Sequence, residues 1–214
     1  MAKIGIDMDG VLANFNFAYA ALLEQVSGQR LFHEGYRGDP NWPATWNYAR
    51  DAGYEDYEHE AWQRILSPAT KFWESLDALP GIGQTIHTLD QLSQTHDVYF
   101  ITTRPGPDAK QQTEEWLMEQ GMFNPTVLIS TGNKLPLIQG LGLDAFIDDK
   151  PENVQHLSKP ERQTDGVWLT EWTPVCKQTF IVDAPYNRVG ICGGVTRVKN
   201  VQEALDILTF NQEI

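Results

Sequence analysis

The chain has 214 residues, of which 41% are hydrophobic and 21% charged, a composition typical of a globular protein and too apolar for a disordered one. At about 150 residues per domain, this length predicts one large domain with a sizeable insertion, or one large and one small domain. The 29 acidic residues exceed the 16 basic ones and give a net charge of −13, which excludes non-specific binding to a nucleic acid polymer. A small phosphorylated molecule can still bind where a metal ion and a few cations gather at one point.

The two cysteines, Cys176 and Cys192, match no metal-binding or redox spacing and exclude a disulfide framework. The N-terminus has no apolar signal region, because a carboxylate already stands at Asp7. No apolar run reaches the roughly 18 residues that a membrane span needs. We therefore expect a protein of the cytoplasm that has no membrane partner.

Short apolar strands alternate with amphipathic helices along the chain. We expect strands at residues 3–7, 98–101, 127–129, 145–147, 167–169 and 180–182. The spacing of apolar residues predicts helices from residue 11 to the glycine at 28, after the Pro-Gly turn at 80–81, at 107–120, from 134, from 151 and at 201–208. Strands separated by helices predict an α/β, Rossmann-like fold, in which a parallel sheet is covered by helices on both faces to make three layers.

Residues 29–79 interrupt this alternation. A βαβ unit takes a little over 30 residues, whereas about 90 residues separate Asp7 from the second predicted strand. The interval holds four of the seven tryptophans and shows helical patterns at residues 55–66 and after Ser67-Pro68. We therefore predict a small helical cap at residues 29–79, inserted into an α/β core of residues 1–28 and 80–214. The cap would lie over the C-terminal ends of the strands, where open α/β sheets bind ligands.

Two carboxylates follow the first predicted strand directly, in the sequence Asp7-Met8-Asp9-Gly10-Val11. One could act as a nucleophile and the other as an acid and base at one reacting centre. A solvated Asp-Gly turn is an equally good interpretation of this motif alone. A calcium loop is disfavoured, because Val11 stands where that loop needs another oxygen ligand.

A second acidic pair, Asp148-Asp149, follows another predicted strand. Taken alone, capping of the next helix explains such a residue better than catalysis does. Together with Asp7 and Asp9, however, it would place four carboxylates at one edge of the sheet, where each close pair repels by about 4 kcal/mol at an effective dielectric constant near 20. A divalent cation would relieve this repulsion, and oxygen ligands without histidine or cysteine favour Mg²⁺.

Polar and cationic residues occur between the two acidic pairs. The predicted strand at residues 98–101 ends in Thr102-Thr103-Arg104, and Lys134 begins a short helix. Each has an ordinary explanation when taken singly, since threonines cap helices and most lysines and arginines are solvated. Together they would form an anion-binding cradle beside a metal, as phosphoryl transfer requires.

These residues resemble the four motifs of the haloacid dehalogenase-like (HAD) phosphohydrolases. The motifs occur in the family's order: Asp7-x-Asp9-Gly10-Val11, an apolar strand followed by Thr102, then Lys134, then Asp148-Asp149. The longer strings at residues 6–15, 79–81 and 147–153 resemble one branch, the 5′(3′)-deoxyribonucleotidases. The resemblance covers about residues 3–158, with a weaker match at 184–187.

The resemblance implies a role for each motif residue. Asp7 would attack phosphorus and become an aspartyl phosphate, and Asp9 would protonate the leaving oxygen and later activate water. Thr102 would bind the phosphoryl group, and Lys134 would offset its charge; Thr103, the neighbouring hydroxyl at the end of the same strand, is a further phosphate-binding candidate. The implied Mg²⁺ ligands are Asp7, Asp9 through its backbone carbonyl, Asp148 and, directly or through water, Asp149. Phe15 would line the substrate pocket.

Some features depart from this branch or lie outside it. Asn14 stands where the branch often has an acidic residue, and Thr103-Arg104-Pro105 replaces the usual continuation of the second motif. In the predicted cap, Trp42 and Trp46 could stack on a nucleobase, although a small cap also needs tryptophans for its own core. Arg104 could contact the substrate phosphate, with a solvated side chain as the alternative.

We predict a Mg²⁺-dependent phosphomonoesterase that hydrolyses nucleoside monophosphates, of the 5′(3′)-deoxyribonucleotidase type. The alternative enzyme uses the same machinery on another small phosphate, such as a sugar phosphate. A non-catalytic binding module is disfavoured, because it would be expected to lack Asp7, Asp9 or Lys134. The expected partner is a small phosphate ester, and the sequence leaves a homodimer open.

Overall fold

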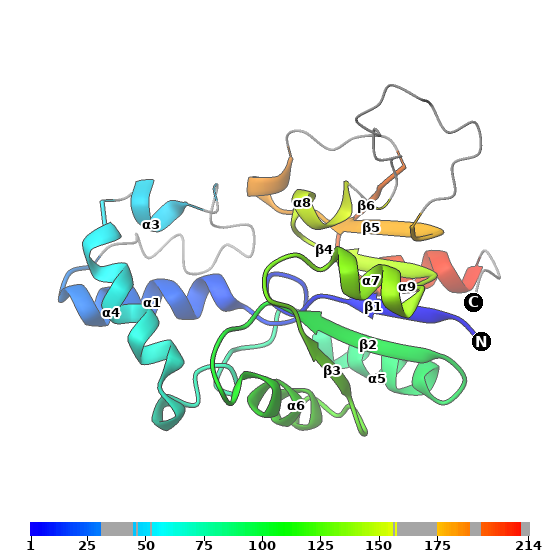
Figure 1. The fold of residues 1–214 in the computed structure, drawn as a ribbon, viewed down its shortest axis with the longest axis horizontal. Coiled ribbons are helices and arrows are strands. Elements are labelled where there is room, and N and C mark those ends of the chain that lie inside the picture. The colour runs from blue at the N-terminus through cyan, green and yellow to red at the C-terminus, as the bar shows by residue number, and fades with distance from the viewer. Residues whose placement is uncertain are drawn as a thin grey trace.

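A computed structural model describes residues 1–30, 45, 47–51, 53–155, 157, 175–188 and 194–210. Its six strands form one sheet in the order β3-β2-β1-β4-β5-β6, and every neighbouring pair is parallel. The strands are β1 (Lys3–Ile6), β2 (Asp97–Thr102), β3 (Thr126–Ile129), β4 (Ala145–Asp148), β5 (Gln178–Val182) and β6 (Thr196–Val198) (Figure 1). The predicted α/β class with a parallel sheet is confirmed.

Five of these strands match predicted ones to within two residues at each end. The sixth, β6, was not predicted, because it has only three residues and two of them are exposed polar side chains that give no apolar pattern. The predicted strand at 167–169 lies outside the described residues.

The helices also follow the predicted pattern, with three differences, one of which is that the short helix α3 at Tyr48–Asp51 has no predicted counterpart. The described helices are α1 (Phe15–Ser27), α3 (Tyr48–Asp51), α4 (Glu55–Leu66), α5 (Ile82–Ser93), α6 (Ala109–Glu119), α7 (Leu135–Leu141), α8 (Pro151–Val154) and α9 (Val201–Phe210), with single 3₁₀ turns η1 (Pro68–Thr70) and η2 (Pro185–Asn187). The predicted helix after Ser67-Pro68 is only the turn η1. The first helix begins at Phe15 rather than at residue 11, because the N–H groups of Leu12 and Ala13 both donate to the carbonyl of Met8 in a tight loop.

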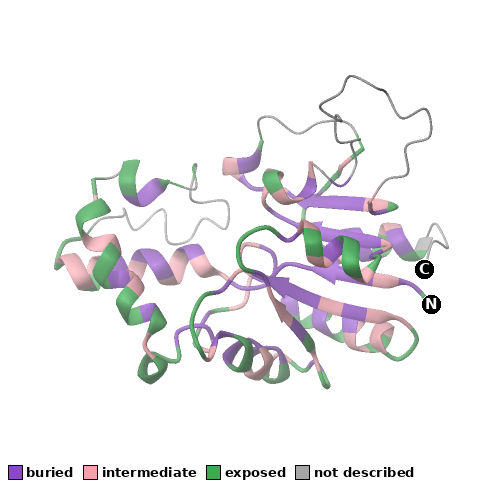
Figure 2. Cartoon of the chain, in the orientation of Figure 1, coloured by how far each residue is buried: buried purple, intermediate pink, exposed green. Residues whose placement is uncertain are grey.

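Alternating side chains of the strands build two buried layers, one on each face of the sheet. Ile4 and Ile6 of β1 and Ile147 of β4 belong to the larger cluster, which packs against α5, α6 and α9. Phe146, between two members of that cluster, belongs instead to a second cluster with residues of α7 and α8. The sheet is therefore the middle of three layers, and burial is concentrated in its central strands (Figure 2).

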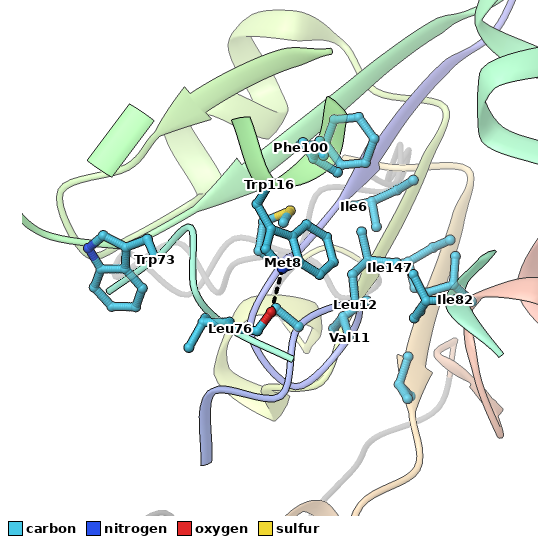
Figure 3. Packing of buried hydrophobic residues seen from close by; sticks show 14 of the residues in the cluster. Ile6, Met8, Val11, Leu12, Trp73, Leu76, Ile82, Phe100, Trp116 and Ile147 are labelled. Carbon is cyan, nitrogen blue, oxygen red and sulfur yellow. Dashed lines mark hydrogen bonds between the residues drawn. The ribbon is translucent and has the colours of Figure 1, made fainter. Parts of the chain in front are cut away.

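Met8 fixes the direction of the loop that follows β1. Its side chain is fully buried and lies among Leu12, Leu76 and Trp116 of the larger cluster (Figure 3). The Trp116 indole N–H donates to the carbonyl of Leu76 at 2.7 Å, and this bond ties α6 to the segment beneath the loop. Because successive side chains alternate in extended chain, the anchored Met8 directs Asp7 and Asp9 away from this core.

The helices α1, α3 and α4 lie together on the side toward which β1 and β2 point (Figure 1). α1 packs against α4, and Tyr19 of α1 donates a hydrogen bond to Glu58 of α4 at 3.1 Å. Among the described residues, no helix is long and apolar enough to cross a membrane.

Candidate active site

The parallel sheet brings two of the predicted carboxylates to one edge. The backbone N–H of Asp7 donates to the carbonyl of Ile147 at 2.9 Å, which extends the pairing of β1 with β4 by one residue. Asp148, the last residue of β4, therefore lies beside Asp7. Oxygen atoms of Asp7, Asp148 and Asp149 lie within 4.8 Å of one another, and all three side chains are buried.

Lys134 joins two of these carboxylates. Its ammonium nitrogen lies 2.6 Å from Oδ1 of Asp7 and 2.7 Å from Oδ2 of Asp148, with the side chain 1% exposed. Burial alone would lower the pKa of Lys134, but the negative charges of Asp148 and Asp7 outweigh burial and raise it. Lys134 thus stays cationic and balances one of the buried negative charges.

The ionised form of Asp7 is disfavoured in spite of its ion pair with Lys134. Burial, with the nearby charges of Asp148 and Asp9, raises the pKa of Asp7 from 3.8 to about 6 against the opposing effect of Lys134. Its Oδ1 also accepts a hydrogen bond from the backbone N–H of Met8 at 2.7 Å. Lys134 and the backbone thus hold this carboxylate in place, and the shared negative charge makes it a strong attractor of cations.

Asp148 and Asp149 are held by different partners. Asp148 accepts hydrogen bonds from the backbone N–H of Lys150 at 2.7 Å and from the side chain of Asn153 at 2.9 Å. Asp149 accepts one from the hydroxyl of Tyr186 at 2.5 Å. Burial, followed by the charges of Asp148 and Asp7, raises the pKa of Asp149 well above its usual range.

The three buried carboxylates fit a divalent cation. Oδ1 of Asp149 is buried and has no hydrogen-bond partner in the part of the chain that the structure describes. Buried polar atoms are rarely left in this state, and an ion is one of the usual reasons for an exception. An all-oxygen donor set of this kind suits a hard cation such as Mg²⁺.

Asp9 lies on the same loop but has a different partner. Its carboxylate accepts hydrogen bonds from Nη2 of Arg104 at 2.7 Å and from Nε at 3.1 Å. The guanidinium is fully buried, whereas the Asp9 side chain is 20% exposed. Arg104 is held in turn by the hydroxyl of Thr113 at 3.0 Å and by the ring of Trp73, whose centroid lies 5.1 Å from the guanidinium carbon. Arg104 therefore reaches a predicted catalytic group, a partner that its sequence context did not indicate.

Of the two predicted phosphate-binding threonines, Thr102 is buried at the end of β2 and Thr103 lines a cavity. Thr102 ends β2 and is 1% exposed, and its carbonyl accepts a hydrogen bond from the N–H of Ser130 at 2.7 Å. Thr103, the next residue, lines a cavity together with Asp7 and Asp9. The second predicted motif thus reaches the same edge as the first.

This cavity has a volume of about 220 Å³ and lies between the carboxylates and the helices α1 and α4. Its lining combines Asp7, Asp9, Thr103, Arg104 and Lys150 with Pro105, Glu58 and the aromatic residues Phe15, Tyr19, Tyr48, Trp62 and Trp73. Phe15, the predicted substrate contact, is one of the residues that line this cavity. Trp42 and Trp46, the other two predicted aromatic contacts, lie outside the described residues.

Phe15 is the centre of an aromatic cluster at this cavity. Its ring stacks on Tyr19 at a centroid distance of 5.4 Å and on Trp73 at 5.8 Å, and Trp62 lies at 6.2 Å. Local sequence pattern indicates only one of these neighbours. Phe15 and Tyr19 are four residues apart on one helix face, a spacing that indicates neighbouring side chains, but the positions of Trp62 and Trp73 depend on tertiary packing.

Comparison with known proteins agrees with the motif order. Residues 1–213 match the sequence profile of the family described as "5' nucleotidase, deoxy (Pyrimidine), cytosolic type C protein". The chain belongs to this family. It is therefore a nucleotidase of the HAD superfamily and a phosphoric monoester hydrolase, and the predicted resemblance is confirmed.

Individual relatives and structures are consistent with this family. A protein of Oceanobacillus iheyensis that carries the name of a nucleotidase is 29% identical over 171 residues, which cover 74% of this chain and 82% of the relative. A HAD hydrolase of Bacillus subtilis, whose structure was determined with magnesium bound, has a TM-score of 0.55 at 15% identity and covers 97% of this chain and 98% of its own. A haloacid dehalogenase-like hydrolase of Burkholderia xenovorans has a TM-score of 0.58 at 12% identity, with 97% of both chains covered. At these identities the two structures support the fold alone.

The raised pKa of Asp7 predicts how the stability of the metal-free protein depends on pH. The neutral form of Asp7 is favoured by folding, so its stabilisation is fully present below pH 3.8 and is lost as the pH rises to about 6. Asp7→Asn keeps this position neutral at every pH. We expect the free energy of unfolding of the variant to exceed that of the unsubstituted protein by about 3 kcal/mol at pH 7.5. At pH 5 the difference between the two free energies should be smaller.

Urea unfolding of both proteins in the presence of a chelator at the two pH values measures this difference. Asp206→Asn, which changes an exposed aspartate on α9, is the matched control and should have little effect. A less stable Asp7→Asn variant at pH 7.5, or an advantage that grows as the pH falls, would contradict the assignment of a buried electrostatic penalty to Asp7.

Proposed function

We propose that this protein is a Mg²⁺-dependent phosphomonoesterase that hydrolyses nucleoside monophosphates, as a 5′(3′)-deoxyribonucleotidase does. The observation that carries the proposal is the position of Asp7, which is held by Lys134 at 2.6 Å and faces a cavity lined by aromatic rings. Other small phosphates, such as sugar phosphates, could react at the same carboxylates but have no aromatic base to stack on those rings.

The balance of charge supports the need for a divalent cation. Four carboxylates, from Asp7, Asp9, Asp148 and Asp149, lie at this edge, and ion pairs among the described residues join Lys134 and Arg104 to three of them. Lys150 is a third cation close to Asp149, so one negative charge remains in excess when all four carboxylates are ionised. Asp7, Asp148 and Asp149 would hold the ion by their side chains, and the carbonyl of Asp9 is the further ligand that the family resemblance implies. When bound, Mg²⁺ would neutralise the excess charge and polarise a phosphoryl oxygen.

The side chains support a two-step reaction. A carboxylate oxygen of Asp7 would attack phosphorus, the bond from phosphorus to the ester oxygen would break, and protonated Asp9 would give its proton to that oxygen. Asp9 would then accept a proton from a water molecule, whose oxygen attacks the phosphorus of the aspartyl phosphate and releases inorganic phosphate and Asp7. Lys134, Thr102 and Thr103 would bind the phosphoryl oxygens, since positioning and neutralisation of charge supply most of the catalysis in such reactions.

The aromatic cavity supports a nucleoside as the leaving group. The rings of Phe15, Tyr19, Trp62 and Trp73 lie within one cavity with Asp7 and Asp9. Aromatic faces bind nucleobases by stacking, which contributes about 1–3 kcal/mol per base in nucleic-acid-binding proteins. Trp42 and Trp46 remain predicted contacts. The family description, which names deoxy and pyrimidine nucleotides, supports the same substrate class.

Arg104 is best explained as a residue that positions Asp9. We predicted that it contacts substrate, and it does line the cavity, but its guanidinium already binds the Asp9 carboxylate through two nitrogens. Thr113 and the Trp73 ring fix the guanidinium from other sides. A planar donor held in this way would keep the carboxylate in one orientation toward the cavity.

Other parts of the prediction remain proposals. The core of residues 1–28 and 80–214 with a cap at 29–79 is our preferred division, with α1 connecting the two because it packs on α4. The family description includes the word cytosolic, which supports a cytoplasmic location. The required partner is a small phosphate ester, and a homodimer is compatible with this function but not needed for it.

Release of phosphate from a panel of monoesters tests the proposed function. With Mg²⁺ present, we expect kcat/KM for dUMP and dTMP to exceed that for AMP and for a hexose phosphate by at least tenfold. A chelator should abolish the activity, and Asp7→Asn should lower it at least 10³-fold, because the nucleophile is lost. Preference for the hexose phosphate would contradict the proposed substrate, and activity in Asp7→Asn would contradict the mechanism.

The role of Arg104 is tested by the leaving group. Arg104→Lys keeps the charge but cannot hold both carboxylate oxygens in one plane. We expect kcat/KM for dUMP, which needs a proton on its leaving oxygen, to fall about 10²-fold, the lower end of the range for general acid catalysis. The value for p-nitrophenyl phosphate, whose leaving group needs no proton, should fall less than tenfold. Arg64→Lys, at an exposed position on α4, is the control. Equal losses for both substrates would mean that Arg104 binds the phosphate itself.

A further inference from the structure

A segment close to the C-terminus contacts the acidic cluster. It follows β5 and includes the turn η2, and it lies 37 residues beyond Asp149. The Tyr186 hydroxyl donates to Oδ2 of Asp149 at 2.5 Å, and the side-chain amide of Asn187 donates to the main-chain carbonyl of Asp149 at 2.8 Å. Two successive residues thus bind the side chain and the backbone of the same aspartate.

This segment is itself firmly held. The fully buried Asn187 also donates to the carbonyl of Val182 at 2.7 Å, and its Oδ1 accepts hydrogen bonds from the N–H of Ala184 at 3.1 Å and from Arg197 at 2.7 Å. Arg197 donates in addition to the backbone carbonyl of Asn187 at 2.9 Å. Asn187 therefore links β5 and β6 to the end of β4, and Tyr186 has a fixed support.

The two carboxylate oxygens of Asp149 differ in their hydrogen bonding. Oδ2 accepts the tyrosine hydroxyl, whereas Oδ1 is buried without a hydrogen-bond partner among the described residues. A carboxylate bound at one oxygen only is free to use the other as a ligand. The same contact fixes the rotation of the carboxylate, because the hydroxyl belongs to a residue whose own position is set by η2.

Gly10 provides the space for this pair. A Cβ atom at Gly10 would lie 2.2 Å from Oδ2 of Asp149 and 2.9 Å from the hydroxyl of Tyr186, so any larger residue would displace one of them. Gly10 also has φ +81°, a conformation that other residues rarely adopt. Gly10 of the loop after β1 therefore packs directly against the hydrogen bond between Asp149 and Tyr186.

We propose that Tyr186 is a positioning residue of the metal site, which orients Asp149 so that Oδ1 is available to the cation, and that Asn187 and Arg197 support it. The inference rests on the proposed function only in taking Mg²⁺ as the cation. Outer residues of this kind are important in metal sites, where their loss typically lowers metal affinity or activity about 10- to 100-fold.

Binding of Mg²⁺ to full-length Tyr186→Phe, measured by isothermal titration calorimetry without substrate, tests the proposal. The substitution removes one hydroxyl and keeps the ring, and urea unfolding of the metal-free variant checks that it is folded. We expect the Kd for Mg²⁺ to rise at least tenfold. We also expect the Mg²⁺ concentration for half-maximal phosphate release to rise in parallel, while kcat at saturating Mg²⁺ stays within about threefold. Tyr99→Phe, which removes the hydroxyl of a β2 residue outside the site, should leave Kd unchanged.

Four outcomes are decisive. A Kd within twofold of the unsubstituted protein would overturn the role of Tyr186, even if the protein is an active nucleotidase. A loss of kcat that saturating Mg²⁺ does not restore, with unchanged Kd, would also overturn it. Asp149→Asn is the reference for a damaged metal site. If this variant and the unsubstituted protein bind Mg²⁺ with the same Kd, the metal site itself is misassigned. An absence of phosphate release from every monoester would refute the proposed function separately.

Discussion

The structure depends on the burial of several carboxylates around a single lysine. Asp7, Asp148 and Asp149 are all at most 4% exposed, and Lys134 forms an ion pair with the first two of them. Removal of charges from water is costly, and one ammonium group cannot balance three carboxylates. The raised pKa values of Asp7 and Asp149 express this cost. A site that is unfavourable in the absence of a cation is well suited to bind one, together with a phosphate whose oxygens need that same cation.

The rest of the fold keeps these charges close together. Parallel pairing of β1 with β4 sets Asp7 beside Asp148, and Met8 is buried in the core so that its two acidic neighbours cannot turn inward. Arg104 holds Asp9 from the β2 side of the site, and Tyr186 holds Asp149 from the β5 side. Each side chain is fixed by a different element, so the arrangement needs the whole sheet rather than one local motif.

The sequence predicts the parts of this arrangement that depend on local pattern. Five of the six strands, their parallel arrangement and the motif residues at their ends follow from apolar periodicity and from the family resemblance, whereas the order of the strands in the sheet does not. The partners of those residues do not. From the sequence, Arg104 is a loop residue that could contact phosphate. Its guanidinium points to Asp9 because Thr113 of α6 and the ring of Trp73 hold it there. Tyr186 lies in a short turn without periodicity, and its contact with Asp149 requires β5 to lie beside β4. The start of α1 differs from the prediction for a related reason: Val11 stands four residues before Phe15, as in a helix, but it packs into the core from the loop.

A crystal structure of the protein with Mg²⁺ and beryllium trifluoride, a mimic of a phosphoryl group on aspartate, would test the central claim most directly. We expect one Mg²⁺ about 2.0–2.1 Å from carboxylate oxygens of Asp7 and Asp148. Asp149 should face the ion through Oδ1, and the trifluoride should be attached to Asp7 with Lys134 beside it. A cation bound elsewhere, or a trifluoride on any residue other than Asp7, would contradict a buried carboxylate cluster built for phosphoryl transfer.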